Sequence, residues 1–261
     1  MKISIIGGGN MGGAIACGLV SGDASEISSV TVIDQNIKIV EILNKINPRI
    51  KVAINNYESL NDANIIIIAV KPWLVETVLI ENKDKFDFEK QLFISIAAGV
   101  SLEQLQTWTI DKAKLYRVIP NTAIAIKQSM TFICPINTRP DNDLLVQNIF
   151  EKLGKVEFIK ENMVSAATSL SSCGIAYAFR YIRAAMEGGV EMGLPALQSR
   201  DILIQTLRGA IELLETNQSH PESEIDKVTT PGGITIKGLN EMEHAGFTSA
   251  VIRGLKASNL K

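Results

Sequence analysis

A glycine-rich turn near the start of the chain limits its possible folds more than any other feature. Residues 2–6 (Lys-Ile-Ser-Ile-Ile) are typical of a buried strand, and residues 11–20 have the pattern of a helix. Between them Gly7, Gly9 and Gly12 stand at the spacing GxGxxG. Such glycines allow a tight turn, a close approach of the backbone to a pyrophosphate, and close packing of helix on strand. The order strand, turn, helix therefore predicts a dinucleotide site at a helix N-terminus.

Size and charge fit a globular protein that acts on a small molecule. The chain has 261 residues, of which 46% are hydrophobic and 21% charged, enough for two domains with cores of their own. A net charge of −2 and the lack of a dense Lys/Arg run argue against nucleic acid or a membrane surface as partner. The most apolar stretch, residues 65–70, is too short to span a bilayer. The chain enters a strand at once, so we expect a cytoplasmic protein.

The cysteines and histidines argue against several kinds of chemistry. Cys17, Cys134 and Cys173 are odd in number and widely spaced, which favours free thiols over disulfides or metal ligands. His220 and His244 have no ligand-like spacing, so no metal site is predicted. So few histidines also disfavour a Ser-His-Asp hydrolase.

Short apolar runs alternate with helical patterns through the first 160 residues. Strands are predicted over 2–6, 30–33, 51–54, 65–70, 92–97, 114–118, 130–134 and 156–159, and helices over 11–21, 37–47, 75–80, 102–108 and 142–153. This alternation predicts an α/β fold with a Rossmann-type, doubly wound and mainly parallel sheet. The run 65–70 is apolar throughout, as expected of a central strand that helices cover on both faces.

After residue 160 the strand signals stop. Helices, the first of them single or double, are predicted over 162–192, 203–214, 235–244 and 248–260, with breaks at Gly193-Leu194-Pro195 and Gly246. We therefore expect a dinucleotide-binding domain over 1–160 and an all-helical domain over 161–261.

Candidate cofactor residues follow the strands at their carboxyl ends, where an open α/β sheet binds its ligand. They are Gly7, Gly9, Asn10, Met11 and Gly12 of the glycine loop, Asp34, the segments Ala69-Val70-Lys71-Pro72 and Ala97-Ala98-Gly99, and Asn121. Each segment alone is also what an ordinary turn contains. Their shared location at one edge of the sheet favours a binding site.

Asp34 bears on the choice between NADH and NADPH. It lies 22 residues after Gly12, where an acidic side chain can accept hydrogen bonds from the adenosine ribose. Its charge opposes a 2′-phosphate, which favours NADH, although Lys38 is close enough in sequence to offer a counter-charge. The alternative is that Asp34 only caps the turn before the next helix.

Segments along essentially the whole chain resemble the pyrroline-5-carboxylate reductase family. They are residues 9–15 (Gly-Asn-Met-Gly-Gly-Ala-Ile), 69–72 (Ala-Val-Lys-Pro), 95–100 (Ser-Ile-Ala-Ala-Gly-Val), 117–122 (Arg-Val-Ile-Pro-Asn-Thr), 192–195 (Met-Gly-Leu-Pro), His220-Pro221, 230–236 (Thr-Pro-Gly-Gly-Ile-Thr-Ile) and Gly246-Phe247. The first four are shared with other reductases of similar architecture. The segment 230–236 is specific to this family.

The resemblance implies reduction of 1-pyrroline-5-carboxylate, a cyclic imino acid, to L-proline with NADH or NADPH, the last step of proline biosynthesis. It implies that the catalytic Thr235 hydrogen-bonds the ring nitrogen, and that the backbone of residues 233–235 holds the substrate carboxylate. The implied substrate-binding residues are Thr230, Gly232, Gly233, Ile234 and Thr235, and Asn56 is an implied cofactor ligand.

The chain departs from the family pattern at two places. The stretch Ser172-Cys173-Gly174-Ile175-Ala176-Tyr177 lacks the family's proline, which puts its helix geometry in question, and Ile225 replaces a basic residue before Asp226.

The chemistry of the residues agrees with this resemblance. Hydride transfer to a protonated imine needs neither a nucleophile nor a metal, only a well-placed cofactor and a small anion site. Pro231-Gly232-Gly233 before a predicted helix supplies free N–H groups for a carboxylate, although the same residues also suit a plain turn between helices.

Two other functions stay open. Another imine or β-hydroxyacid oxidoreductase is possible, but carbonyl reduction calls for a positioned acid, commonly a lysine, and residues 169–192 contain Arg180 and Arg183 but no lysine. A nucleotide-sensing regulator without turnover would keep the glycine loop and Asp34 but has no need of residues 230–235.

The composition of the predicted helical domain also indicates that the chain associates with a second copy of itself. Small residues crowd one predicted helix, at Ala176, Ala178, Ala184, Ala185, Gly188 and Gly189. Since the sheet already has its own helices, the extra apolar surface predicts a symmetric partner. The resemblance implies a homodimer or larger homo-oligomer in which Thr235 faces a cofactor held by the neighbouring chain.

Overall fold

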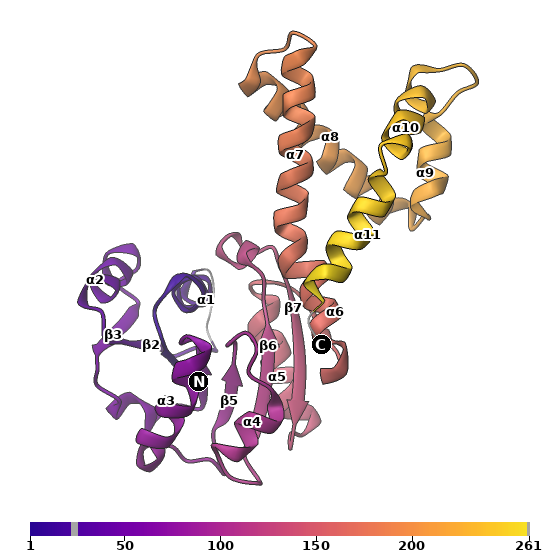
Figure 1. The fold of residues 1–261 in the computed structure, drawn as a ribbon. Helices are drawn as coiled ribbons and strands as arrows, with labels where there is room; N and C mark the ends of the chain where they lie inside the picture. The colour runs from indigo at the N-terminus through magenta and orange to yellow at the C-terminus, as the bar shows by residue number, and fades with distance from the viewer. Residues whose placement is uncertain (22–25, 260–261) are drawn as a thin grey trace. The chain divides into compact units, whose positions relative to one another are not determined.

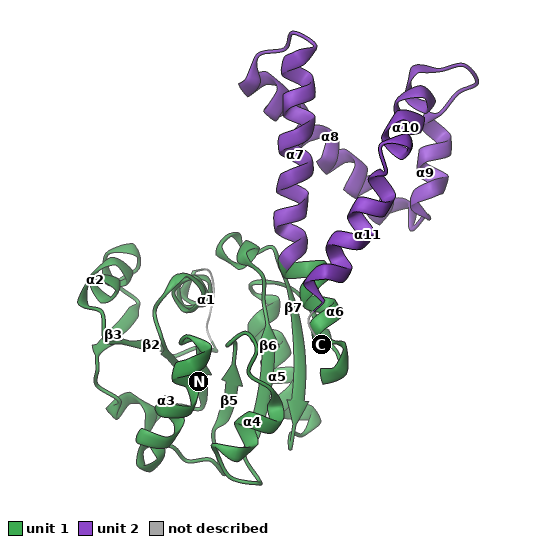
Figure 2. Ribbon diagram, viewed as in Figure 1, with its two compact units in different colours: residues 1–172 green, residues 173–261 purple. Residues whose placement is uncertain are grey.

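The computed structural model describes residues 1–21 and 26–259, which fall into two compact units, 1–172 and 173–261 (Figure 2). The sequence pattern puts a domain boundary at residue 160, where the strand signals end. The first unit runs further because Val164, in helix α6 (Val164–Thr168), is only 5% exposed and lies in that unit's core.

Unit 1 is built on a single eight-stranded sheet (Figure 1). Its strands are β1 (Lys2–Ile6), β2 (Ser29–Asp34), β3 (Ile50–Ile54), β4 (Ile65–Ile68), β5 (Leu92–Ser95), β6 (Lys114–Ile119), β7 (Ser129–Ile136) and β8 (Gly154–Phe158), in the order β3-β2-β1-β4-β5-β6-β7-β8. Every neighbouring pair is parallel except β6 with β7. The predicted doubly wound, mainly parallel sheet is confirmed, and its strand order reverses between β1 and β4.

Helices cover both faces of this sheet. One core contains side chains of α1 (Asn10–Val20), α2 (Ile37–Ile46) and α5 (Pro140–Glu151), and the other contains those of α3 (Val75–Glu81) and α4 (Leu102–Thr107). In β4, Ile65 and Ile67 enter the first core while Ile66 and Ile68 enter the second, because successive side chains of a strand alternate. The expected double coverage of this strand is confirmed.

Short 3₁₀ turns complete the unit: η1 (Glu58–Leu60), η2 (Pro72–Leu74), η3 (Lys83–Lys85), η4 (Thr122–Ile126) and η5 (Glu161–Met163). Two strands are shorter than predicted. β4 ends at Ile68 and β5 at Ser95, since the residues after them leave the sheet as loops.

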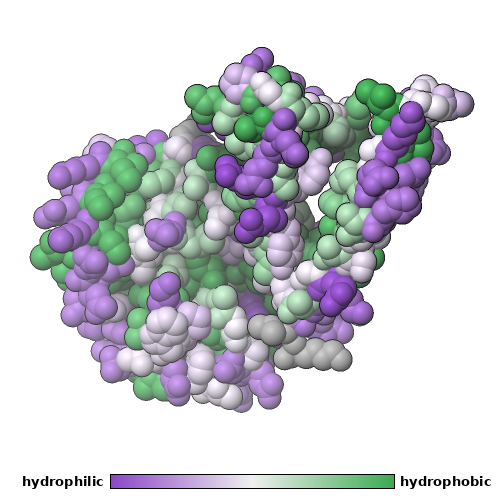
Figure 3. Space-filling view, turned by 45° about the horizontal axis from the view of Figure 1, so that its top comes forward, coloured by the Kyte–Doolittle hydropathy of each residue, from purple (hydrophilic) through white to green (hydrophobic). Residues whose placement is uncertain are grey.

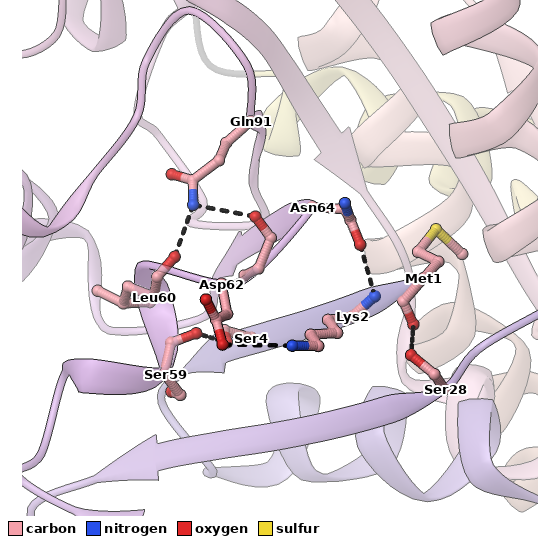
Figure 4. A network of polar contacts seen from close by, with 10 residues as sticks. Met1, Lys2, Ser4, Ser28, Ser59, Leu60, Asp62, Asn64 and Gln91 are labelled. Carbon is pink, nitrogen blue, oxygen red and sulfur yellow. Dashed lines mark hydrogen bonds and ion pairs between the residues drawn. The ribbon is translucent and has the colours of Figure 1, made fainter.

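The amino-terminal edge of the sheet is tied by polar contacts (Figure 4). Lys2 N donates to Asn64 Oδ1 over 2.7 Å. The Gln91 side chain, only 3% exposed, donates from Nε2 to Leu60 O (2.6 Å) and to Ala63 O (3.0 Å). The two Gln91 bonds satisfy buried polar groups at the edge opposite the strands' carboxyl ends.

Unit 2 consists of helices α7 (Gly174–Glu191), α8 (Ala196–Asn217), α9 (Pro221–Val228), α10 (Ile234–His244) and α11 (Phe247–Ser258) (Figure 1). α7 and α8 meet closely, because a Cβ on Gly189 would lie 2.7 Å from Ser199 Oγ. Tyr177 on α7 donates its hydroxyl to Gly254 O on α11 over 3.3 Å. No helix among the described residues is long and apolar enough to cross a membrane.

The predicted helical run over 162–192 contains a π turn at Ser169–Cys173, directly before α7. Ile175 stands where the family pattern has a proline, and α7 passes through it without interruption. The sequence pattern did not indicate α9, although Pro221 at its first position is an ordinary helix-start signal. His220 is its N-cap and accepts from Glu222 N through its side chain.

Candidate active site

The glycine loop packs against the end of β4. Gly7 has φ +103°, its N–H donates to Ile33 O over 2.8 Å, and a Cβ there would lie 2.7 Å from Ala69 O. A Cβ on Gly12 would overlap the Gly7 carbonyl oxygen. Only glycine fits either position, as the GxGxxG interpretation requires.

Gly9 differs from the other two glycines of the motif. A Cβ there would meet nothing within 4 Å, so this glycine is not needed for packing within the chain. It is the N-cap of α1 and offers no side chain to cap the helix. The first N–H groups of this eleven-residue helix therefore have no side-chain cap among the described residues, which fits a pyrophosphate.

Asp34 ties the end of β2 to the glycine loop. Its Oδ2 accepts from Gly8 N over 2.7 Å, and its Oδ1 accepts from Asn36 N over 2.8 Å. The capping role left open by the sequence is therefore present. Each oxygen keeps a further lone pair, so hydrogen bonds from a ribose remain feasible. Burial, and then the charge of Asp34, raise the pKa of the nearby Tyr57 phenol.

The remaining loops follow β3, β4 and β5. Asn56, after β3, accepts from Glu58 N, the first residue of η1, at its Oδ1 over 3.0 Å. Ala69 N donates to Ile6 O over 2.8 Å, and the exposed Lys71 follows as the N-cap of η2. After β5, Gly99 has φ +82° and a Cβ there would meet nothing within 4 Å.

Asn121, at the carboxyl end of β6, is 5% exposed and held on several sides. Its Oδ1 accepts from Ala123 N (3.0 Å), its N–H donates to Ser129 Oγ (3.1 Å), and its Nδ2 donates to Ser171 Oγ (3.3 Å). The sequence pattern gave Ser171 no role, since fifty residues separate the two side chains.

An ion pair next to this edge also escaped the sequence analysis. Arg117 Nη1 lies 2.7 Å from Glu161 Oε1, which also accepts from Leu102 N at the start of α4 over 2.8 Å. The pair thereby holds the end of the loop that follows β5. Burial, and then the Glu161 charge, raise the pKa of the neighbouring Cys134 thiol to about 11, so it stays neutral at physiological pH.

The predicted substrate segment opens α10 in unit 2. Thr230 O accepts from Gly233 N over 2.9 Å, and Gly232 has φ +74°, the features of a type II turn with Pro231 at its second position. Gly233 is the N-cap and carries no side chain to cap the helix. The turn and the free helix N-terminus therefore occur together. A plain turn between helices and a site for a carboxylate, the two interpretations of this segment, are compatible.

Unit 1 brings the predicted cofactor residues to one edge of its sheet, at the carboxyl ends of six parallel strands, β1 to β6. The predicted substrate residues belong to the other unit. Within it Thr230 and Thr235 are exposed, and Ile234 is 88% exposed. Among the described residues, no group of three or more His, Cys, Asp or Glu side chains is placed to hold a metal.

A Rossmann unit with this glycine loop, followed by a helical unit, defines a class of NAD(P)H-dependent oxidoreductases. Two family models match the chain: one described as NADP oxidoreductase coenzyme F420-dependent over residues 2–99, and one described as pyrroline-5-carboxylate reductase dimerisation over residues 161–261.

Three similar proteins specify the family. Pyrroline-5-carboxylate reductase 1 of Dictyostelium discoideum is 37% identical over 99% of this chain, which spans only 49% of that protein's length. The Synechocystis pyrroline-5-carboxylate reductase is 34% identical over 99% of this chain and 96% of its own length. The crystal structure of Plasmodium falciparum pyrroline carboxylate reductase with NADP bound superposes with a TM-score of 0.88 at 27% identity, covering 99% of this chain and 95% of that one. The chain belongs to the pyrroline-5-carboxylate reductase family.

Gly9→Ala should separate cofactor binding from folding. Because its Cβ would meet nothing within 4 Å, the melting temperature without cofactor should stay unchanged. The methyl group would stand where the pyrophosphate approaches, so Kd for NADH and NADPH should rise on the order of tenfold or more. Gly12→Ala is the comparison and should lower stability even without cofactor. Unchanged cofactor binding in Gly9→Ala, measured by calorimetry, would place the pyrophosphate elsewhere.

Proposed function

We propose that this chain reduces 1-pyrroline-5-carboxylate to L-proline with a hydride from NADH or NADPH, the last step of proline biosynthesis. The single observation that carries the proposal is the turn at residues 230–233, which leaves the N-terminus of α10 free in a chain with a complete glycine loop. The similarity to family members across essentially the whole chain supports it.

The proposed roles of the substrate residues follow from their chemistry. A free helix N-terminus favours an anion, so the N–H groups of residues 233–235 would bind the substrate carboxylate. The exposed Thr235 hydroxyl would accept a hydrogen bond from the protonated ring nitrogen and thereby orient the C=N bond. The bound cofactor supplies the hydride. A protonated imine is already electrophilic, so no further acid is required.

The cofactor would lie along the carboxyl edge of unit 1. Its pyrophosphate would meet the N-terminus of α1, and its adenosine would lie beside Asp34 and Asn56. The loops at residues 69–72 and 97–99, with Asn121, would border the nicotinamide side. The fixed carboxylate of Asp34 favours NADH over NADPH.

The alternatives have less support. α7 carries Arg180 and Arg183 but no lysine, so this helix offers no ammonium group to protonate a carbonyl oxygen. A nucleotide sensor without turnover does not account for the free helix N-terminus at Gly233.

A homodimer is the proposed assembly. Gly189 and Ser199 are the only buried residues among residues 173–259, so this unit buries no large apolar side chain of its own. Phe179, Leu197 and Met192 are 65%, 68% and 80% exposed, and apolar residues are visible on the surface in Figure 3. Apolar helices without a core favour a symmetric partner. In this assembly Thr235 would face the cofactor of the neighbouring chain.

The cytoplasm is the proposed location. The thiols of Cys17, Cys134 and Cys173 are free, as suits a reducing compartment.

Thr235→Val should lower kcat/KM for 1-pyrroline-5-carboxylate by roughly 10- to 150-fold. The change keeps the side-chain volume but deletes a hydrogen bond to a charged group, worth about 1.5–3 kcal/mol. Steady-state kinetics at fixed NADH measure it. Thr107→Val is the matched control in unit 1, where the hydroxyl only donates to Gln104 O. Equal kinetics of both variants would show that Thr235 is structural.

Removing the charge of Asp34 should shift cofactor preference toward NADPH. Asp34→Asn and Asp34→Ser should each raise the ratio of kcat/KM with NADPH to that with NADH about tenfold, since about 1.4 kcal/mol of charge repulsion is relieved. Asp62→Asn is the control, because Asp62 pairs with Lys2 at the opposite edge of the sheet. If all three variants share one ratio, Asp34 does not select the cofactor.

A mixture of two impaired variants should regain activity at limiting NADH. After subunit exchange, half of the dimers contain one Thr235→Val and one Gly9→Ala chain. Each such dimer keeps one intact site if the cofactor and Thr235 come from different chains, so roughly a quarter of wild-type activity is expected. A mixture no more active than its components, or a fully active monomer in sedimentation, contradicts the shared site.

A further inference from the structure

A bridging hydroxyl connects the end of β6 with the π turn inside unit 1. Ser171 Oγ accepts from Asn121 Nδ2 over 3.3 Å and donates to Met130 O on β7 over 3.4 Å. It therefore uses both its acceptor and its donor capacity. The hydroxyl joins three segments: the carboxyl end of β6, the start of β7, and the π turn.

The π turn determines which of its side chains faces the sheet. Ser169 is 3% exposed and Leu170 is 68% exposed, while Ser171 contacts Asn121. A π turn holds an extra residue, so relaxing it to an α turn would rotate the side chains beyond it by about 100°. Ser172 Oγ is buried without a hydrogen-bond partner among the described residues, so the turn is not favoured by that hydroxyl. The hydrogen bond from Asn121 to Ser171 is one interaction that favours the π turn over an α turn.

One N–H of the Asn121 side-chain amide has no acceptor among the described residues. Its Oδ1 accepts from Ala123 N, and one of the two Nδ2 hydrogens is donated to Ser171. The described residues supply no acceptor for the second. In a residue only 5% exposed, an unpaired donor is unfavourable, and an acceptor on a bound ligand would relieve it.

We propose that Ser171 is a positioning residue, which orients the Asn121 amide so that its remaining N–H donates to the carboxamide oxygen of bound nicotinamide. The inference rests on the proposed function. Asp34 places the adenosine beside β2, so the nicotinamide end lies toward β5 and β6, where Asn121 is found. The carboxamide oxygen is the neutral acceptor of that ring. Such a contact sets ring orientation, which acts on kcat more than on KM.

Two alanine variants in the same turn test the assignment. Ser171→Ala should lower kcat about 3- to 10-fold while KM for NADH changes less than twofold, as expected for the loss of one neutral hydrogen bond. Ser169→Ala is the matched control, because that hydroxyl only donates to Ser165 O four residues earlier (3.0 Å). Its kcat should stay at the wild-type value. Ser171→Thr retains the hydroxyl and should restore kcat to within about twofold.

A change in the cofactor separates positioning from a merely structural role. Reduced thionicotinamide dinucleotide presents sulfur, a poor acceptor, in place of the carboxamide oxygen, so the wild type and Ser171→Ala should then differ less than twofold. Equal kcat for Ser171→Ala and Ser169→Ala overturns the inference. So does a Ser171→Thr variant as slow as Ser171→Ala, or a Ser171→Ala effect that is the same with both cofactors.

The fluorescence of bound NADH provides a readout that needs no turnover. Emission should differ between wild type and Ser171→Ala but not between wild type and Ser169→Ala, and identical spectra for all three overturn the inference. A wild-type chain that binds NADH but leaves 1-pyrroline-5-carboxylate unreduced contradicts the proposed function instead, and the spectra still decide the role of Ser171.

Discussion

The contact between the glycine loop and the end of β4 is the constraint on which the proposed site depends. Gly7 approaches Ala69 O so closely that no side chain fits between them, and Gly12 approaches Gly7 in the same way. These contacts place α1 directly above the point where strand order reverses. The Asp34 carboxylate fixes the same loop from β2 through Gly8 N. One set of short-range contacts thus positions the glycine loop, the start of α1 and the Asp34 carboxylate, beside which the adenosine is proposed to lie.

The proposed site uses backbone rather than side-chain cations to bind negative charge. α1 and α10 both begin at a glycine N-cap, Gly9 and Gly233, and neither helix has a side chain that caps its first N–H groups. A serine or aspartate at either position would satisfy the helix internally and compete with a ligand. The two helix starts lie in different units. In the proposed function the first would bind the cofactor pyrophosphate and the second the substrate carboxylate.

Much of unit 1 could be predicted from sequence because its signals are local. All eight strands lie where apolar runs indicate them, and the carboxyl ends of parallel strands necessarily share an edge. The π turn and the contact between Asn121 and Ser171 could not be predicted, since they depend on packing between segments fifty residues apart. Nor could the sequence pattern show that the Asp34 carboxylate already accepts hydrogen bonds from Gly8 N and Asn36 N before any cofactor binds. The roles of Thr230, Gly232, Gly233, Ile234 and Thr235 stay predictions, because they require the bound substrate.

The lack of buried large apolar side chains between residues 173 and 259 has a thermodynamic consequence. Helices that do not bury their apolar faces within one chain gain little from packing, and isolated helices of 8 to 22 residues are marginal or weakly stable in water. In the proposed dimer their folding free energy would come from association, and by mass action it would depend on subunit concentration. Dilution would then melt the helical unit while the sheet unit, with two cores of its own, stays folded. Newly made chains would pass through a state in which the cofactor-binding unit is folded and the substrate unit is not. Reductase activity would therefore appear only after two chains associate.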